Sequence, residues 1–577
     1  MGKNNPRNSG GPGPDSQTIF MAVIVITAVS ILGTAQLGAL AGWKFDGAAK
    51  PPVNPFETVT GLFKGDVRWT IISTVTAIAL WTVIGALVYL WVRSKPKKSR
   101  TTTGQAARYL APKSQLATMS RKAAEKKAVR FVGEDLAADY PGLRMGKDLQ
   151  SKRALYSSWE DLYLVIFGPR RGKTTSQVIP AIVDAPGHVI TTSNKRDIVD
   201  DTIELMRQRG QTWVFDPQRI ASGLDQTPWF FDPLDLVRRD PHLMDSAAMR
   251  LASIFRAAEL GANVGSDAFF SEGGKELLAQ FFLAAALDNR PISDVYLWVS
   301  DDGDRTPIGI LEQFPEWKQQ AVGLAATYRI TEKTRSGIFS QAKKMAASLG
   351  RREALKWVTS TEGAKKFIAE KFVRGNGRDT VYVLSKEGDD NAAALTTALI
   401  ASITTAAEKY GEEKGGRLPV PLVAALDEAA NIVRWPELPN LYSHYGSRGI
   451  ILMTILQSYA QGVEVWGENG MELLWSAASV VLYGGGVRDE KMLHKLESLI
   501  GDYEELSKSV SRSADGGRST SVQAREKKIL TAAELAALPF GQALAFTGRQ
   551  PFLLELEPYW TRGYWDEHTR QLLPRQR

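Results

Sequence analysis

The residues best suited to chemistry form one short glycine-rich stretch, Gly168-Pro169-Arg170-Arg171-Gly172-Lys173-Thr174-Thr175. It follows the apolar run 162–167 and precedes a segment with helical pattern, 174–182. Backbone N–H groups of such a turn at a helix N-terminus point at phosphate oxygens. A lysine at this place reaches the β- and γ-phosphates, and a threonine hydroxyl binds Mg²⁺. The pattern predicts a nucleotide-binding loop with Lys173 on the phosphates and Thr174 on the metal.

The spacing of this loop departs from the usual phosphate-binding motif, which has four residues between its glycines. Only three residues separate Gly168 from Gly172, and Phe167 occupies the place of the first glycine. Arg170 and Arg171 are expected to add positive charge to the shorter loop. If this loop is considered by itself, the alternative is a strand–turn–helix that resembles the motif by chance. The sequence does not determine which atoms of the shorter loop contact the phosphates.

A pair of acids follows another apolar run. Residues 421–426 have the pattern of a buried strand that ends in Asp427 and Glu428. A carboxylate at the C-terminal edge of a strand beside a phosphate loop can hold Mg²⁺, which is the role predicted for Asp427. Glu428 is then placed to activate the attacking water. Such pairs also occur by chance, so this prediction depends on the phosphate loop.

Two further residues flank the apolar run 450–456. Gln457 follows it, where the C-terminal end of a strand can carry a residue that senses the γ-phosphate. Arg448 precedes it and is a candidate arginine finger for a neighbouring subunit, because such fingers can act in trans. An ordinary surface arginine is the alternative for Arg448. The predicted cofactors of the whole site are ATP and Mg²⁺.

Beyond residue 150, short apolar runs alternate with helical segments, which predicts an α/β fold with a parallel sheet. Several runs are continuously apolar, as strands covered on both faces are. The helical pattern of 240–375 predicts an all-helical domain inserted into the α/β domain. The predicted strands are Leu162–Phe167, His188–Thr192, Trp213–Phe215, Val381–Leu384, Leu422–Leu426, Ile450–Leu456, Val480–Tyr483 and Ala543–Phe546.

Two stretches near the N-terminus carry no charge, 17–43 and 69–92. About 20 apolar residues cross a bilayer, so both stretches predict transmembrane helices. A basic cluster after the second, between Arg93 and Arg100, places the rest of the chain in the cytoplasm by the positive-inside rule. The expected location is the inner membrane, multi-pass, with both termini cytoplasmic. A cleaved secretory signal is the alternative for the first stretch.

Composition limits the chemistry. The chain has 577 residues and no cysteine, which excludes disulfides, zinc sites with thiolate ligands and cysteine nucleophiles. Its five histidines lack metal-ligand spacing. The net charge of +8 is compatible with DNA or a lipid surface. The basic segment 93–127 is expected to lie near lipid, with a DNA-contacting stalk as the alternative.

Taken in order, these motifs resemble the type IV secretion coupling proteins, the TraG/TraD-like conjugative DNA-transfer ATPases. The resemblance covers almost the whole chain. The motifs that carry it are the two N-terminal stretches, Gly168–Thr175, Thr191-Thr-Ser-Asn-Lys195, Phe215-Asp-Pro-Gln218, the helical insert, Leu426-Asp-Glu-Ala-Ala-Asn431 and Thr454-Ile-Leu-Gln-Ser458. The resemblance implies a RecA-like motor that assembles as a hexamer and contacts other secretion components at the inner membrane.

The resemblance also implies a division of labour. The helical insert would recognise a relaxase–DNA complex, and the motor would deliver DNA to the secretion channel. The expected parts are a disordered tail (1–16), a two-helix membrane anchor in the lipid bilayer (17–92), a basic linker (93–150), a RecA-like domain (151–239 and 376–577) and an all-alpha domain (240–375). The acidic C-terminal tail of some members is not seen in the last residues, 570–577.

Two other functions remain open. The first is an FtsK-like double-stranded DNA translocase. The short stretch of sequence after the last predicted core strands argues against it. The second is a docking receptor for secreted proteins whose ATPase activity is regulatory. The loop 507–525 is expected to be a solvent loop, with a hairpin near the pore as the alternative.

Overall fold

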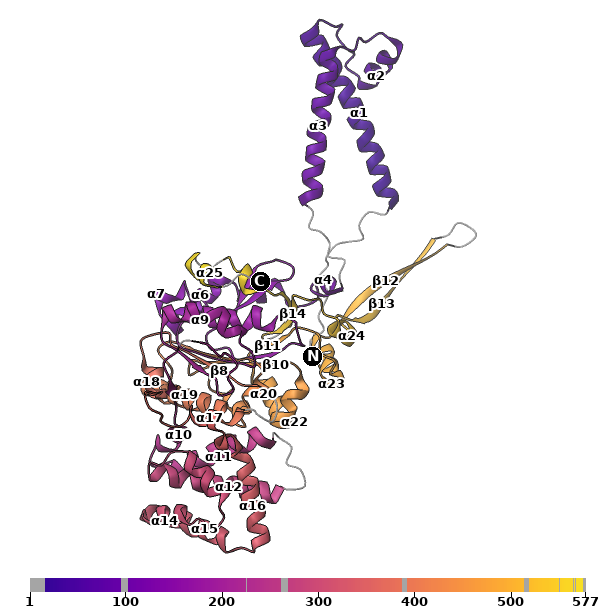
Figure 1. The fold of residues 1–577 in the computed structure, drawn as a ribbon. Coiled ribbons are helices and arrows are strands. Elements are labelled where there is room, and N and C mark those ends of the chain that lie inside the picture. The colour runs from indigo at the N-terminus through magenta and orange to yellow at the C-terminus, as the bar shows by residue number, and fades with distance from the viewer. Residues whose placement is uncertain are drawn as a thin grey trace. The chain divides into compact units, whose positions relative to one another are not determined.

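The computed structural model describes residues 16–94, 102–224, 226–260, 268–386, 392–512, 518–548, 550–563, 565 and 567–573 (Figure 1). Nearly all of the predicted tail, 1–16, lies outside them. The chain forms two compact units. The smaller contains residues 1–100 and 504–525, and the larger contains 101–503 and 526–577.

The smaller unit contains α1 (Ser16–Asp46), α2 (Pro55–Lys64) and α3 (Ile71–Ser94). Helix α1 packs against both α2 and α3. Helix α2 begins at a proline, and the side chain of Asn54 caps it by accepting from the backbone N–H of Phe56 at 3.0 Å. Asn54 and Pro55 therefore set where this connecting helix starts.

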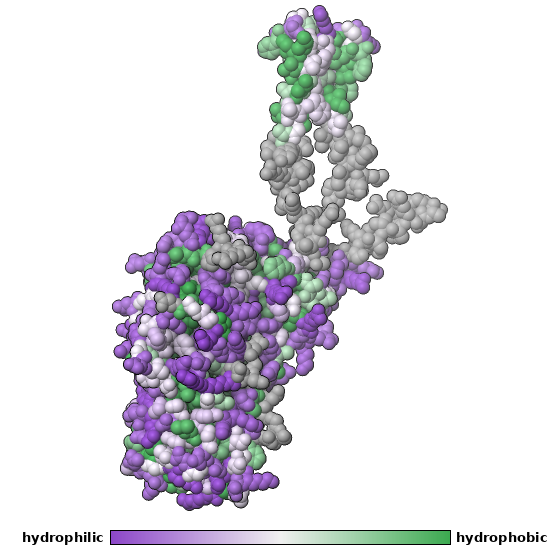
Figure 2. Space-filling view, viewed as in Figure 1, coloured by the Kyte–Doolittle hydropathy of each residue, from purple (hydrophilic) through white to green (hydrophobic). Residues whose placement is uncertain are grey.

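Helices form at both predicted membrane stretches, but over the described residues neither is long and apolar enough to cross a bilayer. Polar side chains interrupt the described parts, among them Thr34 and Gln36 in α1 and Ser73 and Thr76 in α3. Figure 2 shows hydrophobic and near-neutral residues on the described helices of this unit, with hydrophilic residues gathered at its tip. The predictions of two transmembrane helices and of a multi-pass inner-membrane location are therefore wrong.

The larger unit is built on an eleven-stranded sheet with the order β2-β1-β15-β14-β11-β3-β10-β9-β4-β8-β5. The strands from β11 to β5 in this order pair parallel. The strands from β2 to β14 extend the sheet antiparallel. The bounds are β1 Arg144–Asp148, β2 Ala154–Tyr156, β3 Tyr163–Ile166, β4 Val189–Ser193, β5 Thr212–Phe215, β8 Thr380–Leu384, β9 Leu422–Leu426, β10 Ile450–Leu456, β11 Val480–Tyr483, β14 Gln542–Phe546 and β15 Phe552–Glu555.

Every predicted strand is present, and the α/β class with a parallel core is confirmed. Strand β3 explains the continuous apolar runs, because its side chains alternate between two separate hydrophobic clusters. Leu164 and Ile166 belong to one cluster, and Tyr163 and Val165 belong to the other. Helices cover both faces, with α6, α8 and α9 on one side and α19 on the other (Figure 1).

The helices of the α/β part connect the strands. They are α4 (Thr102–Ala106), α5 (Lys113–Ala117), α6 (Arg121–Val132), α7 (Glu134–Ala137), η1 (Thr174–Val178), α8 (Ile179–Asp184), α9 (Asp197–Arg209), α19 (Ala393–Glu413), α20 (Ala429–Ile432), α21 (Leu438–Leu441), α22 (Tyr459–Ala477), α23 (Glu490–Ile500), α24 (Ala532–Ala536), η4 (Tyr559–Thr561) and α25 (Glu567–Leu572).

Between β5 and β8 the chain leaves the sheet and forms mainly helices, gathered at one end of the larger unit (Figure 1). Two short strands, β6 (Trp229–Phe230) and β7 (Lys365–Lys366), pair parallel where the chain leaves and returns. The helices are α10 (Asp235–Arg238), α11 (Met244–Leu260), α12 (Ala268–Leu287), α13 (Ser293–Ser300), α14 (Thr306–Glu312), η2 (Pro315–Trp317), α15 (Lys318–Arg329), α16 (Glu332–Met345), η3 (Ala347–Gly350), α17 (Arg352–Leu355) and α18 (Ala369–Arg374).

The segment predicted as a solvent loop, 507–525, is mostly strand. Strands β12 (Asp502–Arg512) and β13 (Arg518–Lys528) form a two-stranded sheet. The middle of the predicted loop, 513–517, lies outside the described residues. The strands on either side are polar and lack the apolar pattern used to find strands, which is why the sequence did not predict them.

Candidate nucleotide site

The phosphate loop follows β3, as predicted, and its unusual first residue is accommodated by a neighbour. Phe167 is fully buried. A Cβ on Gly484, just after β11, would collide with the Phe167 ring. The backbone N–H of Gly168 donates to the carbonyl of Gly485 at 3.0 Å, and a Cβ on Gly168 would collide with Gly486. The glycines after β11 therefore compensate for the phenylalanine in the loop.

The loop turns through two left-handed residues, Arg170 (φ 57°) and Gly172 (φ 79°). Pro169 and Arg170 are exposed. Arg171 does not point into the loop, because its Nε donates to the carbonyl of Gly484 at 2.9 Å and its Nη2 donates to that of Leu538. Of the two arginines, Arg171 ties the loop to the segments after β11 and before β14.

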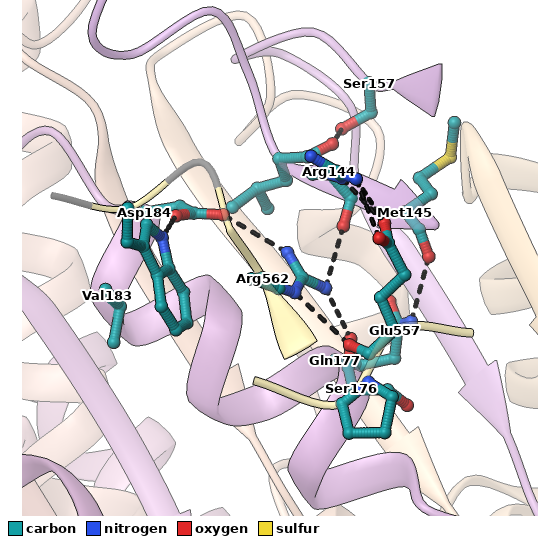
Figure 3. Close-up of polar contacts among 12 residues, drawn as sticks. Arg144, Met145, Ser157, Ser176, Gln177, Val183, Asp184, Glu557 and Arg562 are labelled. Atoms are coloured by element: carbon teal, nitrogen blue, oxygen red, sulfur yellow. Dashed lines mark hydrogen bonds and ion pairs between the residues drawn. The ribbon is translucent and has the colours of Figure 1, made fainter. Parts of the chain in front are cut away.

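The helix after the loop starts as a π-helical turn, η1, and continues as α8. Pro180 has no N–H, so the carbonyl of Ser176 cannot accept the usual bond from the residue four positions on. Arg562 supplies a donor instead: its Nη2 lies 2.9 Å from the Ser176 oxygen (Figure 3). A residue from the C-terminal segment therefore completes the first turn of the nucleotide-binding helix.

The Arg562 guanidinium is fully buried, and Figure 3 shows it within a network of hydrogen bonds and ion pairs. It pairs with the Asp184 carboxylate at 3.4 Å and donates to the carbonyls of Glu557 at 3.2 Å and Arg144 at 3.3 Å. Arg144 in turn binds the Glu557 carboxylate through Nε at 2.7 Å and Nη2 at 2.8 Å. A buried charge needs such complete pairing, because an unpaired one is strongly destabilising.

The predicted acids and the phosphate loop meet at the C-terminal edge of the parallel strands. Thr174 Oγ1 donates to Asp427 Oδ2 at 2.9 Å. The Lys173 ammonium contacts Glu428 directly and lies 3.6 Å from Asp427 Oδ1. The side-chain amide of Gln457 donates to both Glu428 oxygens at 2.9 and 2.8 Å. The structure therefore brings these five residues together.

The surroundings set the charge of this site. Asp427 is only 3% exposed, and burial raises the pKa of its carboxyl to about 6, although the Lys173 ammonium lowers it. Thr192 on β4 donates to the Asp427 carbonyl at 2.6 Å and holds its backbone. Glu428 has left-handed dihedrals, φ 54° and ψ 41°, which are strained for a side-chain-bearing residue. Both acids are thus held where the sheet ends.

The donor set fits a magnesium nucleotide. Within the described part of the chain, no group of three or more His, Cys, Asp and Glu residues could hold a metal ion. Mg²⁺ in nucleotide sites is typically held by one or two protein oxygens together with phosphates and water. Thr174 and Asp427 supply oxygens of this kind, and Thr175 completes the loop by donating to the Gly172 carbonyl at 3.2 Å.

Arg448 lies away from these residues. It precedes β10, whereas Gln457 follows that strand, so the two residues lie at opposite edges of the sheet. Its guanidinium pairs with Glu408 at 2.8 Å and Glu412 at 2.6 Å. Within its own chain Arg448 therefore does not reach the nucleotide site, and its role in trans remains a prediction.

Sequence reasoning missed several residues of the site. Asn431 donates to Glu428 Oε2 at 3.4 Å. Arg562 donates to the Ser176 carbonyl in the first turn of the helix that follows the loop. The three glycines after β11, Gly484–Gly486, also escaped notice. A run of glycines directly after an apolar strand signals close backbone approach, so it was the one available clue.

Comparisons with known proteins find similarity in one segment of the chain and in the fold. A family profile described as the TraM recognition site of TraD and TraG matches residues 421–540. Comparison with curated proteins gives no sequence match. The unbound monoclinic form of the bacterial conjugative coupling protein TrwBdeltaN70 matches at 15% identity with a TM-score of 0.51, over 71% of this chain and 88% of that chain.

Two further solved structures are similar with lower scores. TrwB in complex with ADP and Mg²⁺ has 15% identity and a TM-score of 0.49, over 70% of this chain and 87% of that one. VirB4 of Thermoanaerobacter pseudethanolicus has 14% identity and a TM-score of 0.41, over 72% and 96%. The matched profile and the fold shared with TrwBdeltaN70 confirm the resemblance to the type IV secretion coupling proteins that the motifs predict.

Proposed function

We propose that this chain is an ATP-driven coupling protein that moves DNA to a conjugative type IV secretion channel. The observation that carries the proposal is the joint contact of Lys173 and Thr174 with Glu428 and Asp427. The strands that hold these acids and Gln457 lie within 421–540, the segment matched by the TraD and TraG profile. Asp427, Glu428 and Gln457 therefore lie within the matched segment, whereas the phosphate loop, Gly168–Thr174, precedes it in the chain.

Each residue has a distinct part in ATP hydrolysis. Lys173 would neutralise the β- and γ-phosphates, and backbone N–H groups of Gly168–Thr174 would cradle them. Mg²⁺, held by Thr174 and Asp427, would stabilise the negative charge that develops on the leaving phosphate. Glu428 would accept the proton of the attacking water. Gln457 would orient Glu428 through the two hydrogen bonds that join them.

The wider assembly belongs to the same proposal. We expect six copies to close into a ring, because an arginine acting in trans needs a neighbour. The helices within 240–375 would recognise a relaxase–DNA complex, and the segment 421–540 would carry a recognition site of the kind that the TraD and TraG profile describes. These roles follow from the resemblance, and each needs its own test.

The test is ATP hydrolysis by the full chain with and without DNA. Lys173→Ala is expected to abolish nucleotide binding or turnover. Glu428→Gln should still bind ATP but turn it over at least about 100-fold more slowly, since general bases contribute that much. Lys491→Ala is the matched control, because this lysine is 89% exposed on α23 and should leave turnover unchanged.

The outcomes separate the candidate functions. DNA-stimulated hydrolysis that depends on Lys173 supports the motor. Hydrolysis that depends on Lys173 but ignores every DNA tested supports the docking receptor with regulatory ATPase activity. Normal hydrolysis by Lys173→Ala would contradict the assignment of this loop altogether.

A further inference from the structure

The orientation of a bound nucleotide follows from the positions of the charged residues, and this step rests on the proposed function. Lys173, Glu428 and Gln457 mark the γ-phosphate end, and they face strands β9 and β10 on one side of β3. On the other side of β3 lies β11, parallel to it. A nucleotide whose phosphates follow the loop therefore extends its base toward the side of β11.

An exposed aromatic ring lies on that side. Strand β14 pairs antiparallel with β11, so the residues before β14 lie at the same edge of the sheet as the phosphate loop. Phe540 is among them and is 69% exposed. A Cβ on Gly172 would lie 3.9 Å from Phe540 Cζ, in ordinary contact with the ring. The ring therefore borders the loop directly.

The chain on either side of Phe540 is fixed by contacts and by backbone geometry. Leu538 is buried at 2% exposure, and its carbonyl accepts a hydrogen bond from Arg171 of the loop. The Arg171 guanidinium lies 6.0 Å from the centroid of the Phe540 ring. Gly541 follows with φ 76°, and β14 begins at the next residue. The backbone thus places a large apolar side chain beside the phosphate loop, and that side chain is mostly exposed.

Exposing a phenylalanine costs free energy that burial would recover, and a flat ligand recovers it best. Every nucleobase has a flat aromatic face, and the larger purines cover more of a ring than the pyrimidines. We propose that Phe540, tied to the loop through Arg171, is the stacking platform for the purine base of the bound nucleotide. Stacking alone favours purines over pyrimidines and selects weakly between adenine and guanine.

The experiment compares two ligands that differ only in the presence of a nucleoside. Binding of ATP and of inorganic triphosphate, both with Mg²⁺, is measured on the full chain. Phe540→Ala is expected to weaken the affinity for ATP about 10-fold, which corresponds to the loss of one good stacking contact. The affinity for inorganic triphosphate should not change. Phe540→Trp should restore ATP affinity, because it keeps an aromatic face.

A matched control and the proposed function are tested in the same series. Phe269→Ala removes a ring that is 67% exposed on α12 and should change neither affinity. The proposal would be overturned if Phe540→Ala bound ATP as tightly as the unchanged chain does. It would also be overturned if the variant lost affinity for inorganic triphosphate to the same extent as for ATP. Failure of the proposed function looks different, because Lys173→Ala would then leave both ligands bound.

Discussion

At the scale of single residues, the ionisation of Asp427 links pH to both stability and activity. Burial raises its pKa to about 6, above the value of about 3.9 for an exposed aspartate. The folded chain therefore holds the proton more tightly than the unfolded chain. The ionised carboxylate lowers stability above pH 6, and this cost is relieved as the pH falls through 6.

Activity should change with pH in the opposite direction. Only the ionised Asp427 can hold Mg²⁺, so Mg²⁺-dependent ATP affinity is expected to fall as the pH drops from 7 to 5. The measurement is ATP affinity against pH with and without Mg²⁺, on chains shown to stay folded by circular dichroism. In Asp427→Asn, ATP affinity should no longer depend on Mg²⁺, and it should no longer fall between pH 7 and pH 5. If the affinity of this variant still fell over that range as before, Asp427 would not be the titrating group.

At the scale of elements, the predictable part of the structure is the parallel core. Strands such as β9 are covered on both faces, which makes them continuously apolar and visible in the sequence. Because parallel strands end at one edge, the apolar pattern alone is enough to place Asp427 and Gln457 beside the loop. Strand β1, Arg-Met-Gly-Lys-Asp, pairs at the antiparallel side and has no such signature.

The same contrast explains which site residues escaped prediction. Phe540 and Arg562 reach the site through the antiparallel strands β14 and β15, far along the chain from the loop. Neither belongs to a motif of fixed spacing. Only the pairing of distant strands shows that they touch the nucleotide-binding helix or its loop, and single-sequence patterns contain no information on that pairing.

Arg562 gives the prediction that belongs to this scale. Arg562→Ala leaves the Asp184 carboxylate without its buried arginine and takes a donor from the Ser176 carbonyl. Breaking a buried pair in this way costs about 3–5 kcal/mol, so the apparent melting temperature should fall markedly. ATP affinity should fall as well, because the first turn of the nucleotide-binding helix loses a support.

The matched control for Arg562 lies on the same segment. Arg570, on α25, pairs with Glu567 at 2.9 Å while 48% exposed, and exposed pairs contribute about 0–1 kcal/mol. Arg570→Ala should therefore melt close to the unchanged chain. Arg562→Lys keeps a charge for Asp184 and is expected to recover part of the stability. Unchanged melting and ATP affinity in Arg562→Ala would contradict the role given to this arginine.

At the scale of the whole molecule, the position of Arg448 bears on how copies of the chain would assemble. It lies at the end of β10 opposite the phosphate loop, so it does not reach the site of its own chain, and we expect it to serve a neighbour's site instead. In a closed ring each site would then combine Lys173 of one copy with Arg448 of the next. Arg448→Ala alone should hydrolyse ATP at least about 1000-fold more slowly, the contribution of an arginine finger.

Mixing two inactive variants tests this arrangement directly. A copy with Lys173→Ala still supplies Arg448, and a copy with Arg448→Ala still supplies Lys173, so a mixed ring contains some complete sites. Hydrolysis should therefore reappear when the two variants are assembled together, although each alone is inactive. Lys173→Ala mixed with Glu428→Gln is the control. Both variants damage the site of their own copy, so no complete site forms, and hydrolysis should not rise above the slow rate of Glu428→Gln alone. If the first mixture stayed as inactive as the second, Arg448 would be a surface arginine held by Glu408 and Glu412.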